Sequence, residues 1–512
     1  MRSFLPLILC LWLLPNQLPA QIFPLENDTL NYTLIGFQFQ SVKNAKNYTI
    51  EIASGHFKND ASFKKNIITT ASWKKNKGIL QVPSFAKEYT WRVIPSFAGS
   101  PAVKIKLHHF STGNVYNPDT AVLRFIITHH AEKYKDAYLM MDGNRTMYDM
   151  EGHLVWYLPD MEGIIKPKSQ VRDLKLSPFG TLTLLVDGRA FETDYNGRIL
   201  WEGPNGRKIS SDTMVGYHHE LTMLSNGHFM VLETDPVIKQ TTKTDSTRAK
   251  ADPKDRRPRR IRSQNYGVVT EYNENGKPVW EWRSANYFKN SNLDYYKKSN
   301  GMSEYDIHEN SFYFDEKNKV IYVSFRNISQ VLKVSYPSGE VIAAYGKLEY
   351  PNDSMENHIF CGQHSCHVSE KGYFYVYDNG CGINHIPKIV MMKLPSSEKD
   401  TIEKIWEYPM PVEPIRADGP PAINSVELNK RYMFTAGGNV VELSDNSFFV
   451  SSNVPYNKAL IVSQDKQILW SAEIEKWQSD KKSWVPYPQY RISIIPNREL
   501  LENLIWNSIN LK

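Results

Sequence analysis

The chain has 512 residues, of which 41% are hydrophobic and 12% aromatic, so it can form more than one hydrophobic core. Its net charge of +6 is mild for this length, and no basic recognition helix accompanies it, which argues against a nucleic-acid-binding protein. After the first residues, no apolar run is long enough to span a membrane.

Residues 1–20 have the pattern of a secretory signal peptide. Arg2 precedes the apolar run Phe4–Leu14, and the small-residue site Leu18-Pro19-Ala20 follows it. The run is too short for a membrane anchor, the alternative reading. We therefore expect export to the periplasm or the medium, and cleavage would remove Arg2 and lower the net charge to +5.

Residues 21–115 are predicted to form a separate β-sandwich domain. The segments Tyr48–Ala53 and Tyr89–Pro95 alternate between apolar and polar residues, Gly78–Pro83 lies between them, and no helical pattern is present. The strand Tyr-x-Trp-Arg-Val resembles those of fibronectin type III modules, so a fibronectin III or immunoglobulin-like sandwich is expected. Nothing in this part indicates catalysis.

Residues 116–512 repeat a hairpin in which a tight turn is followed by an apolar strand ending in tryptophan. The turns are formed by pairs such as Asn196-Gly197 and Asn275-Gly276, and the tryptophans should pack between neighbouring sheets. A second strand pair precedes each hairpin, which makes a four-stranded antiparallel unit. Six units are predicted to start near residues 122, 172, 218, 308, 364 and 435. Six copies in phase indicate a six-bladed β-propeller rather than a large sandwich.

One insertion interrupts these repeats. Residues 236–263 carry many lysines and arginines, including Arg256, Arg257, Arg259 and Arg260, and few apolar residues. We expect an unpacked surface loop. A more specific alternative is a cationic lid that attracts an anionic substrate.

Three histidines precede or begin the innermost strands of consecutive units: His219 in Tyr-His-His-Glu, His308 in Ile-His-Glu-Asn-Ser and His364 in Gly-Gln-His-Ser. In a propeller such positions meet at one mouth of the central channel. Arg326 lies on the strand that folds back beside His308. A single histidine of this kind is usually structural. A set of three with an arginine, and without paired carboxylates, suits an anionic substrate and a nitrogen nucleophile better than a metal.

These motifs together resemble the bacterial arylsulfate sulfotransferases. The resemblance rests on His218-His219-Glu, on His308-Glu-Asn310-Ser with Ser-Phe-Arg326, and on Gly-Gln363-His364 followed by Asp378-Asn379-Gly. It implies an exported six-bladed enzyme that moves a sulfuryl group between phenols through a sulfohistidine, without a nucleotide sulfate or another cofactor. Its partners would be a phenolic sulfate donor and a phenol acceptor, and a homodimer is an open alternative.

The resemblance also implies residue roles. His364 matches the nucleophile, and His219, His308 and Arg326 match the groups that hold the sulfuryl oxygens. Asn310 matches a neighbouring amide, Thr435 a hydroxyl in the last unit, and His218 is the rival to His219. Ser365 stands where the family commonly has aspartate, which leaves the orientation of the His364 ring open.

The cysteines leave several pairings open. Cys361, Cys366 and Cys381 remain after cleavage, so an oxidising compartment predicts one bridge and one free thiol. Cys361–Cys366 would close a loop around His364 and would match a disulfide found in many members of the family; Cys366–Cys381 would join two strands. Zinc held by His364, His367 and His385 is a further alternative, although the spacing fits no standard structural zinc site.

Two other classes of protein compete with the transferase. A non-catalytic propeller that binds carbohydrate or protein would carry aromatic and carboxamide residues at the mouth. A sugar hydrolase or lyase would need paired carboxylates, and the nearest, Asp306 and Glu309, flank His308 instead.

Overall fold

The computed structural model divides into two compact units, Met1–Asn114 and Val115–Lys512, each built almost wholly from β-strands. The predicted all-β class is confirmed. The predicted signal peptide lies outside the described part of the chain, and no helix within that part is long and apolar enough to cross a membrane. The structure describes residues 22–98, 105–115, 123–205, 216–238, 263–288, 307–346, 359–380, 386–395, 402–411, 437–453, 457–487 and 489–510.

The first unit contains a five-stranded and a two-stranded sheet. The larger sheet has the order β1 (Asp28–Leu30), β7 (His108–Thr112), β6 (Lys87–Ser96), β3 (Asn47–Ser54) and β4 (Ile67–Trp73), and the smaller pairs β2 (Leu34–Gln38) with β5 (Lys77–Gln81). Strands β3, β5 and β6 confirm the three predicted strands. The ring of Phe37 meets that of Trp91 edge-on at 5.0 Å in the core.

One short helix of this unit was not predicted. Helix α1 (Asp60–Lys65) begins at Asn59, whose side-chain oxygen accepts a hydrogen bond from the Ser62 N–H at 2.9 Å. Asp60 in its first turn and two lysines in its last turn complement the helix dipole. A single helical turn is too short to produce a periodic pattern in the sequence.

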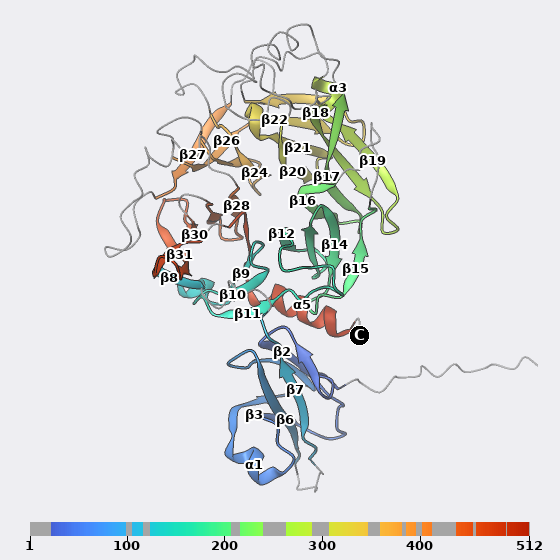
Figure 1. The fold of residues 1–512 in the computed structure, drawn as a ribbon, viewed down its shortest axis with the longest axis vertical. Helices are drawn as coiled ribbons and strands as arrows, with labels where there is room; N and C mark the ends of the chain where they lie inside the picture. The colour runs from blue at the N-terminus through green and yellow to red at the C-terminus, as the bar shows by residue number, and fades with distance from the viewer. Residues whose placement is uncertain are drawn as a thin grey trace, which may run out of the picture. The chain divides into compact units, whose positions relative to one another are not determined.

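In the second unit, six antiparallel sheets surround a common centre (Figure 1). In five of the sheets the innermost strand is the first one in the chain, whereas in the first sheet β33 (Ile492–Ile495), from the C-terminal end, forms the inner edge. These inner strands contact one another in succession from the first sheet to the sixth. The strands of the six sheets, in chain order, are β9 (Tyr138–Met141), β10 (Thr146–Asp149) and β11 (Leu154–Tyr157); β12 (Val171–Leu176), β13 (Leu182–Val186), β14 (Arg189–Thr193) and β15 (Ile199–Glu202); β16 (Tyr217–Met223), β17 (Phe229–Ile238), β18 (Ser263–Tyr272) and β19 (Pro278–Arg283); β20 (Glu309–Asp315), β21 (Val320–Phe325), β22 (Gln330–Ser335) and β23 (Val341–Tyr345); β24 (His364–Val368), β25 (Phe374–Asp378), β26 (Lys388–Lys393) and β27 (Glu403–Pro409); β28 (Asn439–Glu442), β29 (Phe448–Ser451), β30 (Lys458–Val462), β31 (Ile468–Gln478) and β32 (Ser483–Pro486).

The two ends of the second unit are joined in a way that the repeats did not predict. The strand expected to open the first sheet, β8 (Leu123–His129), instead pairs with β31 of the last sheet. The first sheet is completed by β33 (Ile492–Ile495) from the C-terminal end, which pairs with β9. The predicted start near residue 122 is therefore wrong, because strands from both ends of the unit are exchanged to close the set of sheets.

Tryptophans on the outer strands of several sheets link neighbouring sheets. The indole Nε1 of Trp156 donates to the carbonyl of Tyr195 at 2.7 Å, that of Trp280 to Pro337 at 2.8 Å and that of Trp406 to Gln464 at 2.7 Å. Trp470 of the last sheet donates to Met150 of the first at 3.1 Å. The predicted packing of tryptophan between sheets is confirmed, and the last contact connects the sixth sheet to the first.

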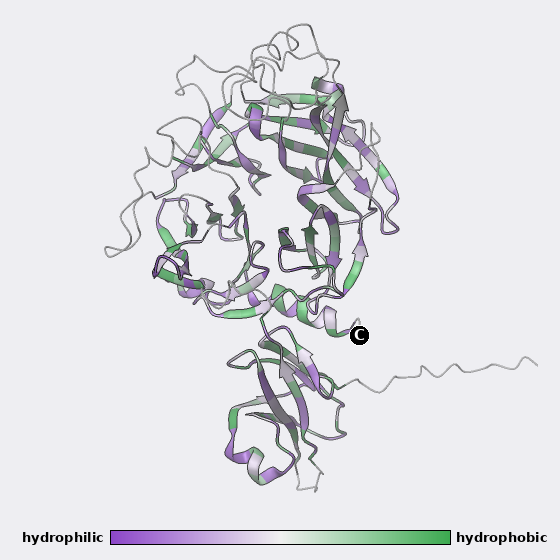
Figure 2. Ribbon diagram, in the orientation of Figure 1, coloured by the Kyte–Doolittle hydropathy of each residue, from purple (hydrophilic) through white to green (hydrophobic). Residues whose placement is uncertain are grey.

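Apolar residues on the strands and on one helix form the core. Figure 2 shows hydrophobic residues distributed over the strands of every sheet of the second unit. Helix α5 (Arg498–Asn510) buries Leu501, Leu504 and Ile505, and Asn507 donates from Nδ2 to the carbonyl of Phe179 at 2.7 Å. The second helix, α3 (Ser284–Phe288), follows β19 directly.

The basic insertion is only partly described. Residues 236–238 and Ser263 continue the hairpin of β17 and β18, with Ile238 paired to Ser263. The expectation that the insertion is unpacked over its full length is therefore wrong at both ends, where backbone pairing extends the strands. Residues 239–262, including the four arginines, lie outside the described part of the chain.

Candidate active site

The three predicted histidines lie near the starts of inner strands, although not at one register position. His364 is the first residue of β24, His308 precedes β20 by one residue and His219 is the third residue of β16. A register shift interrupts the first ladder of each of these sheets. His219 and His308 have left-handed backbones, with φ of 62° and 58°. Such bulges turn side chains away from the regular alternation of a strand.

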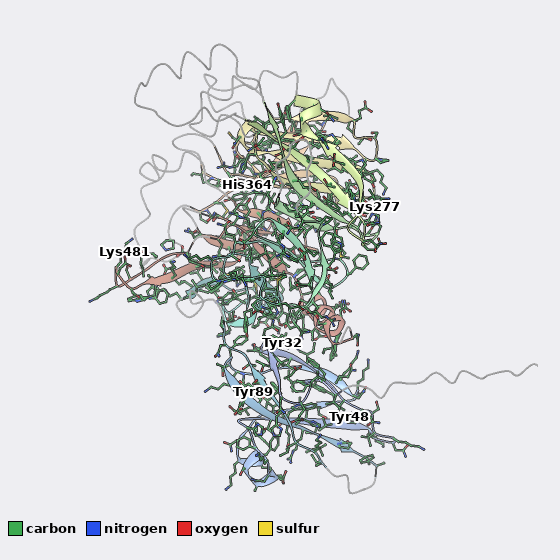
Figure 3. The ribbon with its side chains drawn as sticks, turned by 45° about the vertical axis from the view of Figure 1, so that its right-hand side comes forward. Tyr32, Tyr48, Tyr89, Lys277, His364 and Lys481 are labelled. Atoms are coloured by element: carbon green, nitrogen blue, oxygen red, sulfur yellow. The ribbon has the colours of Figure 1, made fainter. Side chains whose placement is uncertain are left out.

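The His364 ring is buried and held on both nitrogens. Its Nδ1 lies 2.5 Å from Oδ1 of Asn379, and Nδ2 of Asn379 donates to the carbonyl of Gly437 at 2.9 Å. This second bond orients the amide, so its oxygen faces Nδ1 and the ring proton must reside there. Nε2 keeps its lone pair and accepts a long hydrogen bond of 3.3 Å from the N–H of Gly437. Figure 3 places His364 inside the second unit, whereas Lys277 lies at its periphery.

Gly437 must be glycine for this arrangement. Its φ is 72°, and a Cβ at this position would lie 2.4 Å from the carbonyl oxygen of Tyr490. The close approach brings its N–H to His364.

Electrostatics keep His364 and His219 neutral. Burial lowers the pKa of His364 well below its ordinary value, and the charge of Arg326 lowers it further. Burial likewise lowers the pKa of His219, with contributions from His218 and His308. At neutral pH, His364 is therefore a neutral imidazole whose Nε2 electron pair accepts the long hydrogen bond from Gly437, within the field of Arg326.

Arg326 interacts with both His308 and His364. Its N–H donates to the carbonyl of His308 at 2.9 Å, and its charge acts on His364. Gln363 fixes the intervening backbone, since its Nε2 donates to the carbonyl of Phe325 at 3.3 Å and to that of Gln330 at 3.1 Å. The glutamine of the Gly-Gln-His motif thus holds the segment of Arg326 against the strand of His364.

The remaining histidines gather around Tyr490. The rings of His219 and His308 meet edge-on at 4.9 Å, and Nδ1 of His218 lies 2.8 Å from Nδ1 of His219. The Tyr490 ring lies 5.8 Å from His219 and 6.2 Å from His364, and the guanidinium of Arg172 stacks on it at 4.3 Å. Both His218 and His219 therefore belong to the cluster, which also includes an aromatic ring and a further arginine.

Three further residues that the sequence analysis singled out are Asn310, Thr435 and Ser365. Asn310 is fully buried, and its Nδ2 donates to the carbonyl of Gln363 at 2.7 Å, which joins β20 to β24. Thr435 lies outside the described part of the chain. Ser365 does not orient the His364 ring, because its hydroxyl donates to the carbonyl of Val440 at 3.2 Å.

The predicted Cys361–Cys366 bridge is wrong. Cys366 is a free, buried thiol that accepts from the Ser311 hydroxyl at 3.7 Å, while Cys361 is disulfide-bonded. The Cys366 thiol instead donates to the carbonyl of Tyr322 at 3.7 Å. The alternative Cys366–Cys381 bridge is also wrong, because Cys366 is free; Cys381 lies outside the described residues.

The zinc alternative places His367 beside His364, but His367 packs between the rings of Tyr313 and Tyr375, at 5.1 and 5.7 Å. Within the described ranges, no group of three or more histidine, cysteine or carboxylate side chains could hold a metal ion. His385 lies outside these ranges.

Sequence reasoning missed four of the residues described above: Arg172, Asn379, Gly437 and Tyr490. Asn379 belongs to a quoted motif, Asp-Asn-Gly at the end of β25, and could have been assigned as the partner of His364 from that position. Gly437 and Tyr490 lie in the C-terminal part of the chain and Arg172 lies on β12, and nothing in their local sequence indicates that they meet the histidines.

Replacing Asn379 by alanine is expected to lower kcat for group transfer by about 10²-fold, because His364 loses the acceptor that selects its tautomer. Asn379→Asp keeps an acceptor for Nδ1–H and should lose less. Asn144→Ala, at another fully buried asparagine, controls for the loss of a buried amide. Steady-state rates at saturating donor measure the effect, and a kcat for Asn379→Ala within twofold of the parent would contradict it.

The fold and this site define an all-β protein in which a buried, neutral imidazole lies within the field of an arginine. Residues 124–411, more than half of the chain, match the model of the arylsulfotransferase (ASST) family, and the chain belongs to that family. The predicted family is confirmed, and the chain is accordingly a sulfotransferase, a transferase. No curated protein matches the chain.

Several solved structures resemble the chain weakly. A protein of unknown function from Bacteroides caccae is 12% identical, with 70% of this chain and 99% of that chain covered and a TM-score of 0.40. A periplasmic gluconolactonase from Pseudomonas aeruginosa is 10% identical, with 88% and 99% covered and a TM-score of 0.31. A protein from Lactobacillus plantarum is 9% identical, with 70% and 99% covered and a TM-score of 0.30. At these scores the likeness carries no argument.

Proposed function

We propose that this protein transfers a sulfuryl group from a phenolic sulfate ester to a phenol through a sulfohistidine on His364. The observation that carries the proposal is the hydrogen bonding of His364: Asn379 keeps the proton on Nδ1, which leaves the electron pair of Nε2 for attack. A neutral imidazole is both a nucleophile and a leaving group, as a covalent carrier must be.

Two displacements at sulfur complete the reaction. In the first, Nε2 of His364 bonds to sulfur, the bond from sulfur to the aryl oxygen breaks, and the departing phenolate takes a proton. In the second, the acceptor oxygen bonds to sulfur, the sulfur–nitrogen bond breaks and the phenol proton passes to a base. The long bond from the Gly437 N–H to Nε2 is given up in the first step and is restored in the second.

The neighbouring groups would stabilise charge and move protons. Arg326 offers a planar fork to the sulfuryl oxygens, on which charge accumulates in the transition state. His219 and His308, with ring centroids 4.9 Å apart, would supply further donors. Of these, His308 is our candidate for the acid that protonates the phenolate and the base that deprotonates the acceptor.

The finer points of the architecture and cellular location belong to the same proposal. Six antiparallel sheets around a common centre, with the sixth joined back to the first through Trp470, support a six-bladed β-propeller. The two sheets of the first unit support a β-sandwich over residues 21–115. The apolar N-terminal segment supports export to the periplasm or the medium, where a disulfide at Cys361 would be stable.

Turnover of a chromogenic aryl sulfate with and without a phenol acceptor tests the proposal. The covalent carrier predicts ping-pong kinetics, in which double-reciprocal plots at several acceptor concentrations are parallel, without added nucleotide sulfate or divalent metal. Intersecting lines would argue for direct transfer in a ternary complex. Binding of aryl sulfate without turnover under any of these conditions would favour the non-catalytic binding protein.

A further inference from the structure

An arginine near the C-terminal end of the chain contacts the histidine cluster. Arg491 precedes β33, the strand that completes the first sheet, and its side chain is only 6% exposed. Its N–H donates to Oδ1 of Asp142 at 3.4 Å, which holds the backbone beside β9. The guanidinium points away from its own sheet, and its contacts lie on the next three sheets.

Arg491 uses its guanidinium to bind four acceptors. Nη1 donates to Oε2 of Glu220 at 2.7 Å, to Oδ1 of Asp173 at 3.0 Å and to the carbonyl of His219 at 3.2 Å. Nη2 donates to the carbonyl of Asn310 at 2.8 Å. These acceptors belong to β12, β16 and β20, so one side chain joins the inner strands of three sheets to the closing strand of a fourth.

A second cation shares the two carboxylates that the guanidinium of Arg491 binds. Lys175 lies 2.9 Å from Asp173 and also pairs with Glu220. Burial and the charge of Glu220 raise the pKa of Asp173, which Lys175 and Arg491 offset only in part. Burial opposes ionisation of Glu220, but Lys175 and Arg491 outweigh it and lower the pKa of its carboxyl. Removing Arg491 would leave two buried carboxylates with one cation, a costly arrangement.

Two of the four bonds act on residues of the proposed reaction. The His219 carbonyl is bound at a residue whose left-handed backbone is unfavourable for a side chain other than glycine, so it needs support from its surroundings. The Asn310 carbonyl is bound at the residue whose amide donates to Gln363, the neighbour of His364. Displacement of these backbones would move His219 itself and, through Gln363, the segment that carries His364.

We propose that Arg491 is a positioning residue, which holds the backbones of His219 and Asn310 where the site requires them. The C-terminal strand therefore does more than close the set of sheets, since it delivers the group that aligns the histidine cluster. This inference rests on the proposed function, because that proposal assigns His219 and His364 to the transfer of the sulfuryl group, and Asn310 supports His364 through Gln363.

The test compares Arg491→Lys and Arg491→Met with Arg145→Lys. Arg145 is a second buried arginine next to the same first sheet, and its guanidinium binds only the carbonyl of Lys166 among the contacts described. We expect Arg491→Lys to lower kcat at least 30-fold with KM for the donor changed less than threefold, and Arg491→Met to lower kcat further. Arg145→Lys should lose stability without this loss of kcat.

The pH profile provides a readout that a merely structural role would not change. His218, His308, His364, Tyr490 and Arg491 all face His219, and Arg491 also acts on His364. Removing the charge of Arg491 should raise the pKa of both histidines, so the acid limb of kcat/KM should move to higher pH in Arg491→Met. In Arg491→Lys, which keeps the charge, the limb should stay at the parental position.

The outcomes separate this inference from the proposed function. If the parent forms no sulfuryl adduct on His364 with donor alone, both the proposed function and this inference are contradicted. If the parent forms the adduct and Arg491→Lys forms it at the parental rate, only the inference is overturned. If Arg491→Met does not fold, Glu220→Gln, which keeps the arginine and replaces one charged acceptor by a neutral one, should show a smaller loss of kcat than Arg491→Lys. Parental kcat in both of these variants would also overturn the inference.

Discussion

His364→Ala is expected to abolish sulfuryl transfer, with a loss of kcat on the order of 10⁴-fold or more, because the variant lacks the nucleophile. The fold should persist. The free energy of unfolding should fall by about 1–3 kcal/mol, since Oδ1 of Asn379 loses its donor inside the protein. Circular dichroism and thermal unfolding check the second statement, and release of the chromogenic phenol checks the first.

The covalent carrier can be observed directly. Incubation with donor alone, followed by an alkaline quench and peptide mapping, should reveal one added sulfuryl group on the peptide that contains His364, and none in His364→Ala. His367→Phe is the matched control, because His367 lies on the same strand between two tyrosine rings and should leave kcat within about twofold when the stack is kept. An adduct on another residue, or full activity in His364→Ala, would falsify the assignment.

Arg326→Lys is expected to lower kcat by about 10²-fold and Arg326→Met by about 10³-fold, because lysine keeps the charge and loses the two-point fork. The methionine variant should also change the pH profile. Arg326 lowers the pKa of His364, so its removal raises that pKa, and a larger fraction of His364 is protonated and inactive at acid pH. The acid limb of kcat/KM should therefore move to higher pH in Arg326→Met.

Arg189→Lys is the control for this series. Arg189 is a partly exposed arginine on β14 of the second sheet, and its guanidinium pairs with Glu202 on β15 at 2.6 Å. Its exchange should leave both kcat and the pH profile unchanged. Equal activity of Arg326→Lys and Arg189→Lys would show that the fork of Arg326 contributes nothing.

Most of the strands could be predicted from the sequence because their signals are local. Turn glycines such as Gly197 and Gly276 adopt positive φ, as tight hairpin turns require. Alternation and the outer tryptophans identified the four-stranded units, and the motifs around His219, His308 and His364 identified the part of the chain that forms the site. Each of these signals extends over only a few residues, and the conformation of a turn or strand depends mainly on residues that are close together in the sequence.

The sequence by itself therefore determined the all-β class, the repeated sheets and the family to which the chain belongs. Only the tertiary structure decided how the ends of the second unit are joined, which cysteine stays free and what orients His364. The physical reason is the distance along the chain: Arg491 binds Asp173 across 318 positions, and Trp470 binds Met150 across 320. Such contacts form only when all six sheets are assembled, so no pattern within a short stretch of the sequence predicts them.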